Sequence, residues 1–432
     1  MCLLLAGCSG GDDKEAKKAV SAVMAEEASV TVRIKAVGDN LIHSPIYKRC
    51  ATENGYDFTC LYENVAPYLK NADIAAINQE TIFVSDAAAF SGYPEFGTPS
   101  EVGDYAAAAG FNVVTHATNH VLDKRVDAIE NTLNFWKKYP HVSVLGIHES
   151  REDSERITVF GKQNFKIAML NYTYGLNGHV LPKDCSYMVD VYDEEKVEKD
   201  LGRAESEADF TVVFIHFGTE YTHTPTKHQL KDAEFLCENG ADLIIGAHPH
   251  VIQGVDEITA ENGNSAVVFY SLGNFISNQD SISKVLCGMA DVTLTKRNGK
   301  VTVDNYEMLP LVTHAGEKYT AYMLSDYTDE LAAAHRRVRG LTVKKLQSLI
   351  DRRISLRYER NVLADIPDRH PGLFQTVDDP EPLNIIILEH PDSTGRPLYR
   401  WKKSLFIIIS ERGCRNMKHP RRFSYRICHV NL

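Results

Sequence analysis

The chain lacks an uninterrupted hydrophobic run of the roughly 20 residues that a membrane-spanning helix needs. No two of its 9 cysteines are spaced as Cys-x-x-Cys, which excludes the common dithiol redox and zinc-ribbon motifs. Basic residues are in deficit, 47 against 58 acidic ones, and the net charge of -11 weighs against nucleic acid as a partner. With 44% apolar and 24% charged residues, the composition is that of a globular protein.

The first residues carry a short apolar segment, Leu3 to Gly7, directly before Cys8. It resembles a bacterial lipoprotein signal, although it lacks basic residues at its start and is shorter than a usual signal core. We predict that Cys8 is lipidated, that residues 1–29 serve as signal and tether, and that the protein is extracytoplasmic and lipid-anchored to the bacterial cell membrane. A frayed apolar N-terminus is the alternative. In that compartment Cys50 and Cys60, which flank a short loop, could form a disulfide.

Strand-like and helix-like segments alternate from Val30 to about Pro310. This alternation predicts an α/β fold, a layered sandwich of mixed β-sheets flanked by helices. The sheets are expected to be mixed because Asn298-Gly299, between two strand-like stretches, predicts a tight antiparallel hairpin. We expect residues 311–364 to form a small helical C-terminal extension. Residues 365–432, rich in proline and then in basic side chains, are expected to form a poorly ordered tail.

Five apolar, strand-like runs end on side chains that bind metal ions. The carboxyl ends of strands converge in an open α/β sheet, so residues far apart in sequence meet in one crevice there. Carboxylate, amide and imidazole groups gathered in this way predict a site for one or two divalent cations. The predicted ligands are Asp39, Glu80, Asn119, His216, His248 and His250.

The segment His248-Pro249-His250 carries the strongest of these signals. Residues two apart in an extended segment face the same way, so each imidazole could reach one ion of a close pair. Glu80 would be a charge at the end of a buried strand, which is unfavourable unless it is paired or metal-bound. Placed centrally, it could bridge two ions. For each candidate a structural alternative stays open: a loop or core histidine, a turn aspartate or a salt-bridged glutamate.

A second set of residues is predicted to face the substrate. His120 would act as general acid or stabilise charge, and Asp123, one helical turn on, would hold its tautomer. His43, four residues after Asp39, is either a further ligand or a substrate contact. The remaining candidates are Lys124, Arg125 and His223 as contacts to an anionic substrate, with Glu220 and Asn274 as second-shell supports of the ligands.

Six segments of the chain resemble, in order, the motifs of the bacterial CapA family. They are GDNLIH at 38–43, NQE at 78–80, ATNHVLD at 117–123, HFGTEY at 216–221, GAHPHVIQ at 246–253 and YSLGNF at 270–275. The resemblance covers about Val30 to Pro310, and the segment up to Glu359 is similar to the family's C-terminal extension. It implies a calcineurin-like metallophosphoesterase fold and a role in capsule synthesis associated with poly-γ-glutamate.

The resemblance also implies how two ions share the ligands. One ion would be held by Asp39, Glu80 and His250, with His43 as a further ligand. His43 lies four residues after Asp39, whereas typical metallophosphoesterases have Asp-x-His. The other would be held by Glu80, Asn119, His216 and His248. The bridging residue is a glutamate rather than the usual aspartate, and Lys124-Arg125 stands where the family commonly has an aromatic residue and a glycine. The mixed ligands suit two divalent ions of Mn, Fe or Zn.

Two functions follow from these expectations. As a hydrolase, the protein would use a hydroxide bridging the two ions to attack a phosphoester or a γ-glutamyl bond. As a non-catalytic accessory subunit, it would bind or guide an anionic polymer at a membrane polymer-synthase complex. The pair His120 and Asp123 favours catalysis, since a purely structural metal site needs no acid.

Overall fold

The computed structural model describes residues 29–353, 406–408 and 427–429. They fall in two units, residues 1–360 and 361–432. In the second unit the described residues form two short antiparallel strands, β19 (Phe406–Ile408) and β20 (Ile427–His429). The predicted signal and tether up to residue 28, with Cys8, and most of the predicted basic tail lie outside the described residues. All predicted site residues belong to the first unit.

The larger sheet of the first unit joins a parallel half to an antiparallel half. Its strand order is β18-β17-β16-β1-β4-β7-β8, and β15 pairs with the end of β1. Neighbours from β1 to β8 run parallel, as do β1 and β15, whereas β16, β17 and β18 form an antiparallel meander. The strands are β1 (Val30–Asn40), β4 (Ile74–Asn78), β7 (Val113–Thr115), β8 (Ser143–Leu145), β15 (Asn274–Ile276), β16 (Leu286–Arg297), β17 (Lys300–Ala315) and β18 (Tyr319–Met323).

The second sheet has the order β13-β14-β12-β11-β10-β9. Its four central strands run parallel, and β9 and β13 pair antiparallel at the two edges. Its strands are β9 (Thr158–Lys162), β10 (Phe165–Thr173), β11 (Phe210–His216), β12 (Leu243–Ala247), β13 (Val255–Thr259) and β14 (Ser265–Phe269). Both sheets are therefore mixed, as the sequence predicted.

Helices and short strand pairs complete the unit. The helices are α2 (Ser44–Cys50), α3 (Thr59–Tyr62), α4 (Ala66–Leu69), α5 (Glu101–Ala109), α6 (Arg125–Trp136), α7 (Arg151–Ser154), α8 (Glu194–Glu207), α9 (Lys227–Glu238), α10 (Ile282–Val285), α11 (Asp329–Ala333) and α12 (Val343–Arg353). The 3-10 turns are η1 (Ala87–Ala89), η2 (Lys183–Cys185) and η3 (Leu324–Asp326). Two pairs of short strands, β2 (Ala51–Thr52) with β3 (Gly55–Tyr56) and β5 (Phe83–Val84) with β6 (Thr98–Pro99), lie in the connections. Within the described residues, no helix is both long and apolar enough to cross a membrane.

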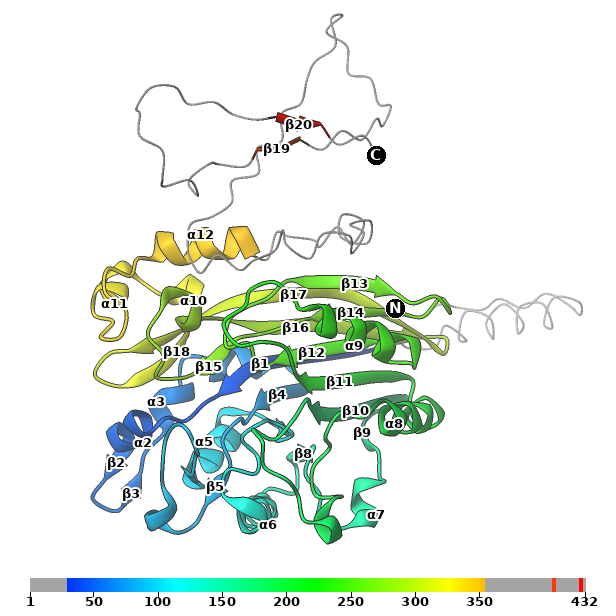
Figure 1. Ribbon diagram of the computed structural model, residues 1–432, viewed down its shortest axis with the longest axis horizontal. Helices are drawn as coiled ribbons and strands as arrows, with labels where there is room; N and C mark the ends of the chain where they lie inside the picture. The colour runs from blue at the N-terminus through cyan, green and yellow to red at the C-terminus, as the bar shows by residue number, and fades with distance from the viewer. Residues whose placement is uncertain (1–28, 354–405, 409–426, 430–432) are drawn as a thin grey trace, which may run out of the picture. The chain divides into compact units, whose positions relative to one another are not determined.

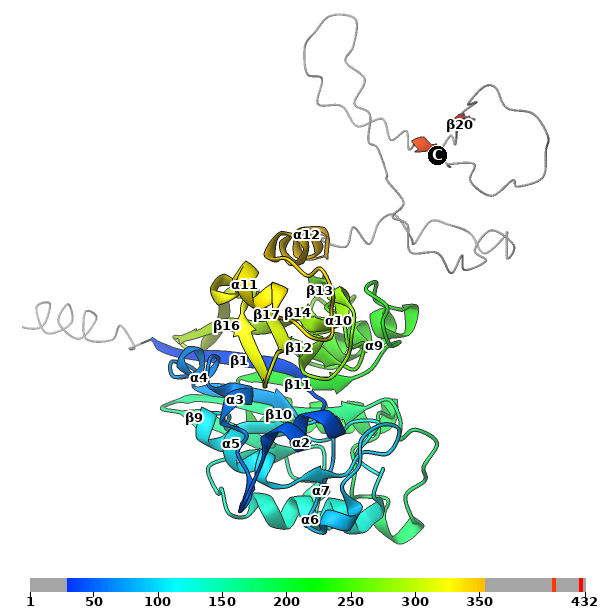
Figure 2. The same ribbon diagram turned by 90° about the vertical axis from the view of Figure 1, so that its left-hand side faces the viewer.

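The two sheets pack face to face between helices, which gives four layers (Figures 1 and 2). Alternate residues of β1 point to opposite sides: Val32 and Ile34 join the core between the sheets, with Val212 of β11, whereas Val37 packs in the core under α2, α3 and α5. On the far side, Leu201 of α8 is buried against the second sheet. Because successive side chains of a strand point to opposite faces of the sheet, one strand contributes residues to the hydrophobic cores on both of its sides.

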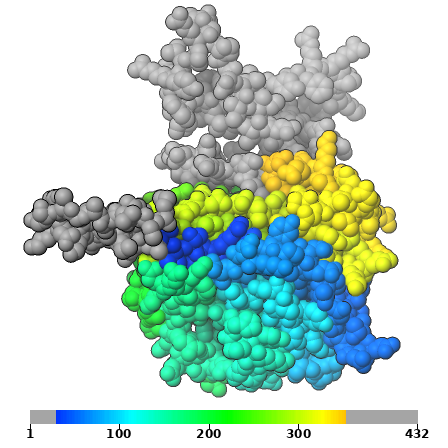
Figure 3. Space-filling view, turned by 180° about the vertical axis from the view of Figure 1, so that it is seen from behind, coloured from blue at the N-terminus to red at the C-terminus, as the bar shows by residue number. Residues whose placement is uncertain are grey.

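The sheet extends further along the chain than predicted. Residues 311–364 were expected to form a helical extension; in the structure β17 continues to Ala315 and β18 returns to Met323 before η3, α11 and α12 follow. Leu311 and Val312 are fully buried because they pair with β16 and pack into the sheet cores. From behind, the beginning of the described chain, in blue and cyan, and the segment that contains β17 and β18, in yellow, lie next to each other on one face (Figure 3).

The disulfide considered for Cys50 and Cys60 is not formed in the structure. Both residues are buried free thiols, and their sulfur atoms lie 4.0 Å apart. A disulfide needs the sulfurs about 2.05 Å apart, so closing this pair requires only a local movement.

Candidate metal centre

The predicted ligands lie at the carboxyl ends of parallel strands from both sheets. Asp39 is the last residue but one of β1, and Glu80 follows β4 by two residues. His216 is the last residue of β11, and His248 follows β12 directly. Because the sheets pack face to face, these strand ends meet in one place. Of the seven residues predicted as ligands, all except His43 are buried, with exposures of 3% or less.

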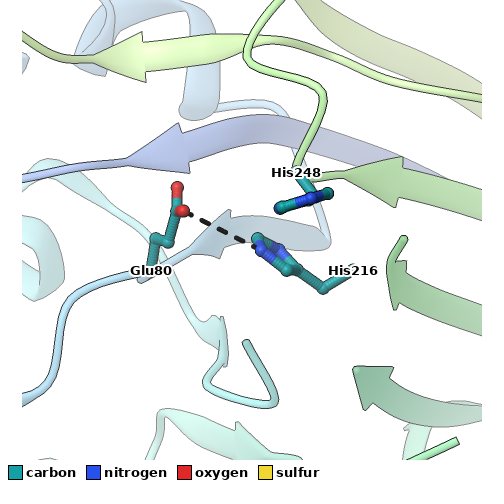
Figure 4. Close-up of side chains that lie close together, drawn as sticks. All are labelled: Glu80, His216 and His248. Atoms are coloured by element: carbon teal, nitrogen blue, oxygen red, sulfur yellow. Dashed lines mark ion pairs between the residues drawn. The ribbon is translucent and has the colours of Figure 1, made fainter. Parts of the chain in front are cut away.

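The ligand atoms form two groups that share Glu80. In the first group Asp39, Glu80 and His250 offer atoms within 4.8 Å of one another, and His250 Nδ1 lies 3.1 Å from Asp39 Oδ2. In the second group Glu80, His216 and His248 do so, and His216 Nε2 lies 3.8 Å from Glu80 Oε1 (Figure 4). Asn119 joins the second group, because its Oδ1 lies 2.9 Å from His216 Nε2.

The unsatisfied atoms of this cluster fit metal ions. Both carboxylate oxygens of Glu80 are buried and have no hydrogen-bond partner, and the same is true of His248 Nδ1. A fully buried carboxylate without a partner is strongly unfavourable in a protein interior. Two divalent ions would satisfy these atoms, and the imidazole, carboxylate and amide set suits Mn, Fe or Zn.

The first group is rich in negative charge. Burial, together with the neighbouring Asp39, raises the pKa of Glu80 well above its usual range, although His250 opposes that shift. Burial alone would lower the pKa of His250, but Glu80 and Asp39 outweigh it and raise this pKa to about 9. In the absence of an ion, this group therefore holds a proton at neutral pH.

The second group consists mainly of neutral ligands. Burial, reinforced by His250 and His120, lowers the pKa of His248 to about 3. Burial and the neighbouring histidines also lower the pKa of His216 well below its usual value. Both imidazoles are neutral at physiological pH, which is the form that binds a metal ion.

The backbone of the His-Pro-His segment is not extended, so the predicted geometry is wrong at this point. His248 and His250 both have left-handed backbone conformations, with φ of 97° and 58°. Strand β12 ends at Ala247, and the chain turns through these residues while the carbonyl of Pro249 accepts a hydrogen bond from the Tyr221 N–H. The two rings diverge into different groups, with centroids 5.9 Å apart. Such strain in non-glycine residues is typical of functional sites.

His120 and Asp123 lie in contact beside the two groups. His120 Nδ1 is 2.7 Å from Asp123 Oδ2, which also accepts a hydrogen bond from the backbone N–H of Phe96. Asp123 accepts a hydrogen bond from the His120 Nδ1–H, which leaves Nε2 as the nitrogen available to a substrate. The edge of the Phe96 ring packs against His120, with centroids 4.8 Å apart. The catalytic role of the pair stays a prediction.

His43 is not part of either ligand group. Its Nδ1 lies 3.0 Å from the Leu41 carbonyl and 3.3 Å from the Asn278 backbone nitrogen, and its ring packs edge-on against Phe96. Burial lowers its pKa to about 4. By residue 43 the chain has left β1 and begins α2, which places this ring at the rim rather than among the ligands. Of the two predicted roles, the position favours a substrate contact.

The remaining predicted residues surround this cluster at its edge. Arg125 is exposed and its Nη1 contacts His179 Nδ1 at 3.0 Å, while Lys124 is half-buried beside it. His223 Nδ1 lies 2.9 Å from the carbonyl of Ile252 and so supports the loop after His250. Asn274 lies directly behind the first group, because its Nδ2 donates to the His250 carbonyl at 3.1 Å. Glu220 is exposed, and its charge contributes to raising the pKa of Glu80.

Asn177 is a supporting residue that sequence reasoning missed. Asn119 Nδ2 donates to Asn177 Oδ1 at 3.0 Å, which directs the other end of the Asn119 amide, Oδ1, toward His216. Asn177 also has a left-handed backbone, with φ of 50°. It lies in a polar loop far from the ligand motifs, and nothing in that loop's composition indicates the contact.

Asn78 contacts one ligand of each group. Its Nδ2 donates to Asp39 Oδ1 at 2.8 Å and lies 3.4 Å from His216 Nδ1. Its own Oδ1 accepts from the Thr115 hydroxyl at 2.9 Å. A polar residue at the end of the otherwise apolar strand β4, two residues before Glu80, was a usable signal for this role.

Two mixed sheets packed between helices, with two ligand groups that share one carboxylate at the strand ends, agree with the α/β fold and the ligand arrangement expected from the motifs. A match to a family model identifies the family of this chain. The chain belongs to the family described as bacterial capsule synthesis protein PGA_cap, whose model matches residues 33–279. The CapA resemblance inferred from the motifs is thereby confirmed.

Two curated relatives are CapA proteins. The chain is 28% identical over 235 residues to a capsule biosynthesis protein CapA of Bacillus anthracis, covering 52% of this chain and 56% of that protein. It is 30% identical over 205 residues to a PGA biosynthesis protein CapA of Bacillus subtilis, covering 47% and 51%. The chain thus matches about half the length of these relatives.

Solved structures show a weaker likeness. A Haemophilus influenzae NAD nucleotidase aligns with a TM-score of 0.43 and 14% identity, covering 76% of this chain and 60% of that chain. The calcineurin-like phosphoesterase YfkN of Bacillus subtilis aligns with a TM-score of 0.38 and 14% identity, covering 75% and 97%. At these scores and identities, the likeness assigns no activity to this chain.

Proposed function

We propose that this protein is a dinuclear-metal-dependent hydrolase acting in the biosynthesis of a capsule or cell-envelope polymer such as poly-γ-glutamate. The observation that carries the proposal is the buried Glu80, which belongs to both ligand groups and whose two oxygens have no hydrogen-bond partner, together with the contact between His120 and Asp123. A site built only to hold ions for stability would not need an imidazole whose tautomer is fixed by a buried carboxylate.

The residues present define which side chains would hold each ion. Asp39, Glu80 and His250 would hold one, and Glu80, His216 and His248, with the Asn119 carbonyl oxygen, the other. Two such ions supply Lewis acidity at the scissile bond and lower the pKa of an attacking water.

The protein's own part in the chemistry centres on His120. Asp123 accepts a hydrogen bond from the His120 Nδ1–H and thereby keeps the imidazole in one orientation. Nε2 can then hydrogen-bond to the reacting group or give its proton to the leaving group as the bond breaks. Phe96 limits water on one side of the ring, since its edge lies against it.

Two bonds remain candidates for hydrolysis. A phosphoester is favoured by the architectural class, and a γ-glutamyl amide by the family's association with poly-γ-glutamate. Both reactions develop negative charge on oxygen beside the ions, so the same ligand arrangement serves either. An anionic polymer or phosphoester is thus the proposed substrate.

The place of action is part of the proposal. Lipidation of Cys8 would hold the domain at the outer face of the bacterial cell membrane, where a capsule polymer emerges, with a membrane polymer-synthase complex as partner. The support is the sequence around Cys8, from Leu3 to Ser9. Labelled fatty acid incorporated by the wild type and not by Cys8→Ser is the expected result.

The second candidate is an accessory subunit that binds or guides the polymer without cleaving it. The same ligand groups could hold ions for structure or for polymer binding. This alternative leaves the His120–Asp123 contact without a purpose.

The substitution His120→Ala separates the two candidates. As a hydrolase, the variant should keep its metal content and lose about 10²- to 10⁴-fold in turnover, the usual range for a general acid. Turnover would be measured on bis(p-nitrophenyl) phosphate and on γ-linked glutamate oligomers, with metal content from elemental analysis. His141→Ala, at an exposed histidine after α6, is the matched control. Unchanged turnover in His120→Ala, or none in the wild type on either substrate, would favour the accessory role.

A further inference from the structure

A lysine without an acidic partner lies at the rim of the first ligand group. Lys284, on α10, places its Nζ 4.1 Å from the centre of the Tyr221 ring. Among the described residues it forms no ion pair, in a region that contains several carboxylates. The Tyr221 ring in turn lies 5.9 Å from the ring of His250. The Tyr221 ring therefore lies between the Lys284 ammonium group and the predicted metal ligand His250.

Hydrogen bonds fix this lysine relative to the metal centre. The amide nitrogen of Asn274 contacts three acceptors: the His250 carbonyl at 3.1 Å, Gln279 Oε1 at 2.9 Å and the Lys284 carbonyl at 3.1 Å. Gln279 Nε2 then lies 3.3 Å from the Tyr221 hydroxyl. Asn274 is fully buried, so the backbone of α10 and the loop of His250 are joined through a rigid residue. The spacing between Lys284 and the first group is set by the fold.

The conformation of Tyr221 also indicates a function. It is a non-glycine residue with a left-handed backbone, φ of 62°, and its side chain is 47% exposed. Its N–H is bonded to the Pro249 carbonyl at 2.7 Å, which keeps the strained residue beside the His-Pro-His turn. Strain that serves only to expose an aromatic side chain next to a cation is unfavourable in the free protein and is typical of a ligand-binding position.

We propose that Tyr221, Gln279 and Lys284 form a subsite for a second negatively charged group of the substrate, the carboxylate of the chain unit next to the bond held at the ions. The proposal rests on the proposed function. The Lys284 ammonium would pair with the carboxylate, the Gln279 amide would donate to it, and the Tyr221 ring would cover the apolar part of the unit. Tyr221 and Gln279 lie within the family match, which ends at residue 279, whereas Lys284, the charged residue of the subsite, lies beyond it.

The subsite predicts a preference for charge that depends on one side chain. Removing one charge-assisted contact should weaken binding about tenfold. We would titrate the full chain, loaded with Mn, by calorimetry with a γ-linked glutamate tetramer and with the same tetramer carrying amidated side groups. The wild type should bind the charged tetramer about tenfold more tightly than the amidated one, and Lys284→Met should remove that difference.

Two further variants control the result. Lys284→Arg keeps the charge and should bind the charged tetramer within about threefold of the wild type, since both cations pair with carboxylates. Lys300→Met removes an exposed lysine at the distant β16–β17 turn and should behave as the wild type. Thermal unfolding of each variant shows that the fold is kept.

The outcomes separate this inference from the function on which it rests. Equal binding of the charged tetramer by Lys284→Met and the wild type overturns the subsite. A wild type that hydrolyses ester substrates and does not bind the tetramer also overturns it, while the hydrolase stands. Binding of the tetramer through Lys284 without cleavage of any bond supports the subsite and overturns the hydrolase.

Discussion

The two ligand groups share Glu80 and differ in almost everything else. The first surrounds one imidazole with two carboxylates, whose charge raises the pKa of His250 to about 9. The second brings together two imidazoles whose pKa values are lowered by burial, and an amide. The first group, with two carboxylates, would attract a cation strongly but would have to release a proton before binding one. The imidazoles of the second group are already neutral and Glu80 is the single carboxylate among its ligands, so we expect its affinity to depend more on how the ligands are oriented.

The supports of the groups differ in the same way. In the first group His250 contacts Asp39 at 3.1 Å, and Asn78 and Asn274 donate hydrogen bonds to Asp39 and to the His250 carbonyl. In the second group Asn119 contacts His216 at 2.9 Å, and the orientation of its amide depends on a loop residue, Asn177. We therefore expect the second group to be sensitive to changes in that loop and the first group to be insensitive to them.

The largest effects are expected from removing one imidazole of each group. His250→Ala should weaken the first ion, and His248→Ala the second, each by more than about a hundredfold, beyond the range known for outer-shell losses. Equilibrium dialysis followed by elemental analysis measures the ions that remain, with His141→Ala as control. Loss of both ions from either variant would show that the groups do not bind separately.

A smaller effect, confined to the second ion, is expected at Asn177. Asn177→Leu removes the acceptor for Asn119 Nδ2 and should weaken the second ion about 10- to 100-fold while leaving the first unchanged. Asn177→Asp keeps an acceptor oxygen and should restore most of the affinity. Calorimetric titration with Mn resolves the two binding steps. If the Leu variant binds both ions as tightly as the wild type, Asn177 does not orient Asn119 for metal binding.

The groups should also differ in their dependence on pH. His250 binds an ion only when it is neutral, and its pKa is raised to about 9, so the affinity for the first ion should rise about tenfold per pH unit up to about pH 9 and fall as the pH is lowered. His248, with a pKa lowered to about 3, is neutral throughout the range from pH 6 to 9 and adds no such dependence. Calorimetry in buffers of different ionisation enthalpy counts the released protons. Equal proton release in both steps would contradict the contrast between the groups.

The sequence predicted the parts of this site that rest on strand geometry. Buried apolar runs end on or near Asp39, Glu80, His216 and His248. Parallel strands have their carboxyl ends at the same edge of a sheet, so these residues were predicted to lie together. Contacts made by loops were not predictable. The turn at His248 and His250 depends on left-handed backbone conformations, and Asn177 reaches Asn119 across 58 residues of sequence. The length of β17 was not predictable either, since the strand continues past residue 310 to Ala315.

Metal stoichiometry of the full chain, beside that of Glu80→Ala, tests the shared carboxylate most directly. Elemental analysis after reconstitution with Mn or Zn should give about two ions per wild-type chain and fewer than one in the variant, since both groups lose a ligand. Glu198→Ala, at an exposed glutamate of α8, should match the wild type. Less than one ion in the wild type, or two ions retained without Glu80, would contradict a dinuclear centre built around that residue.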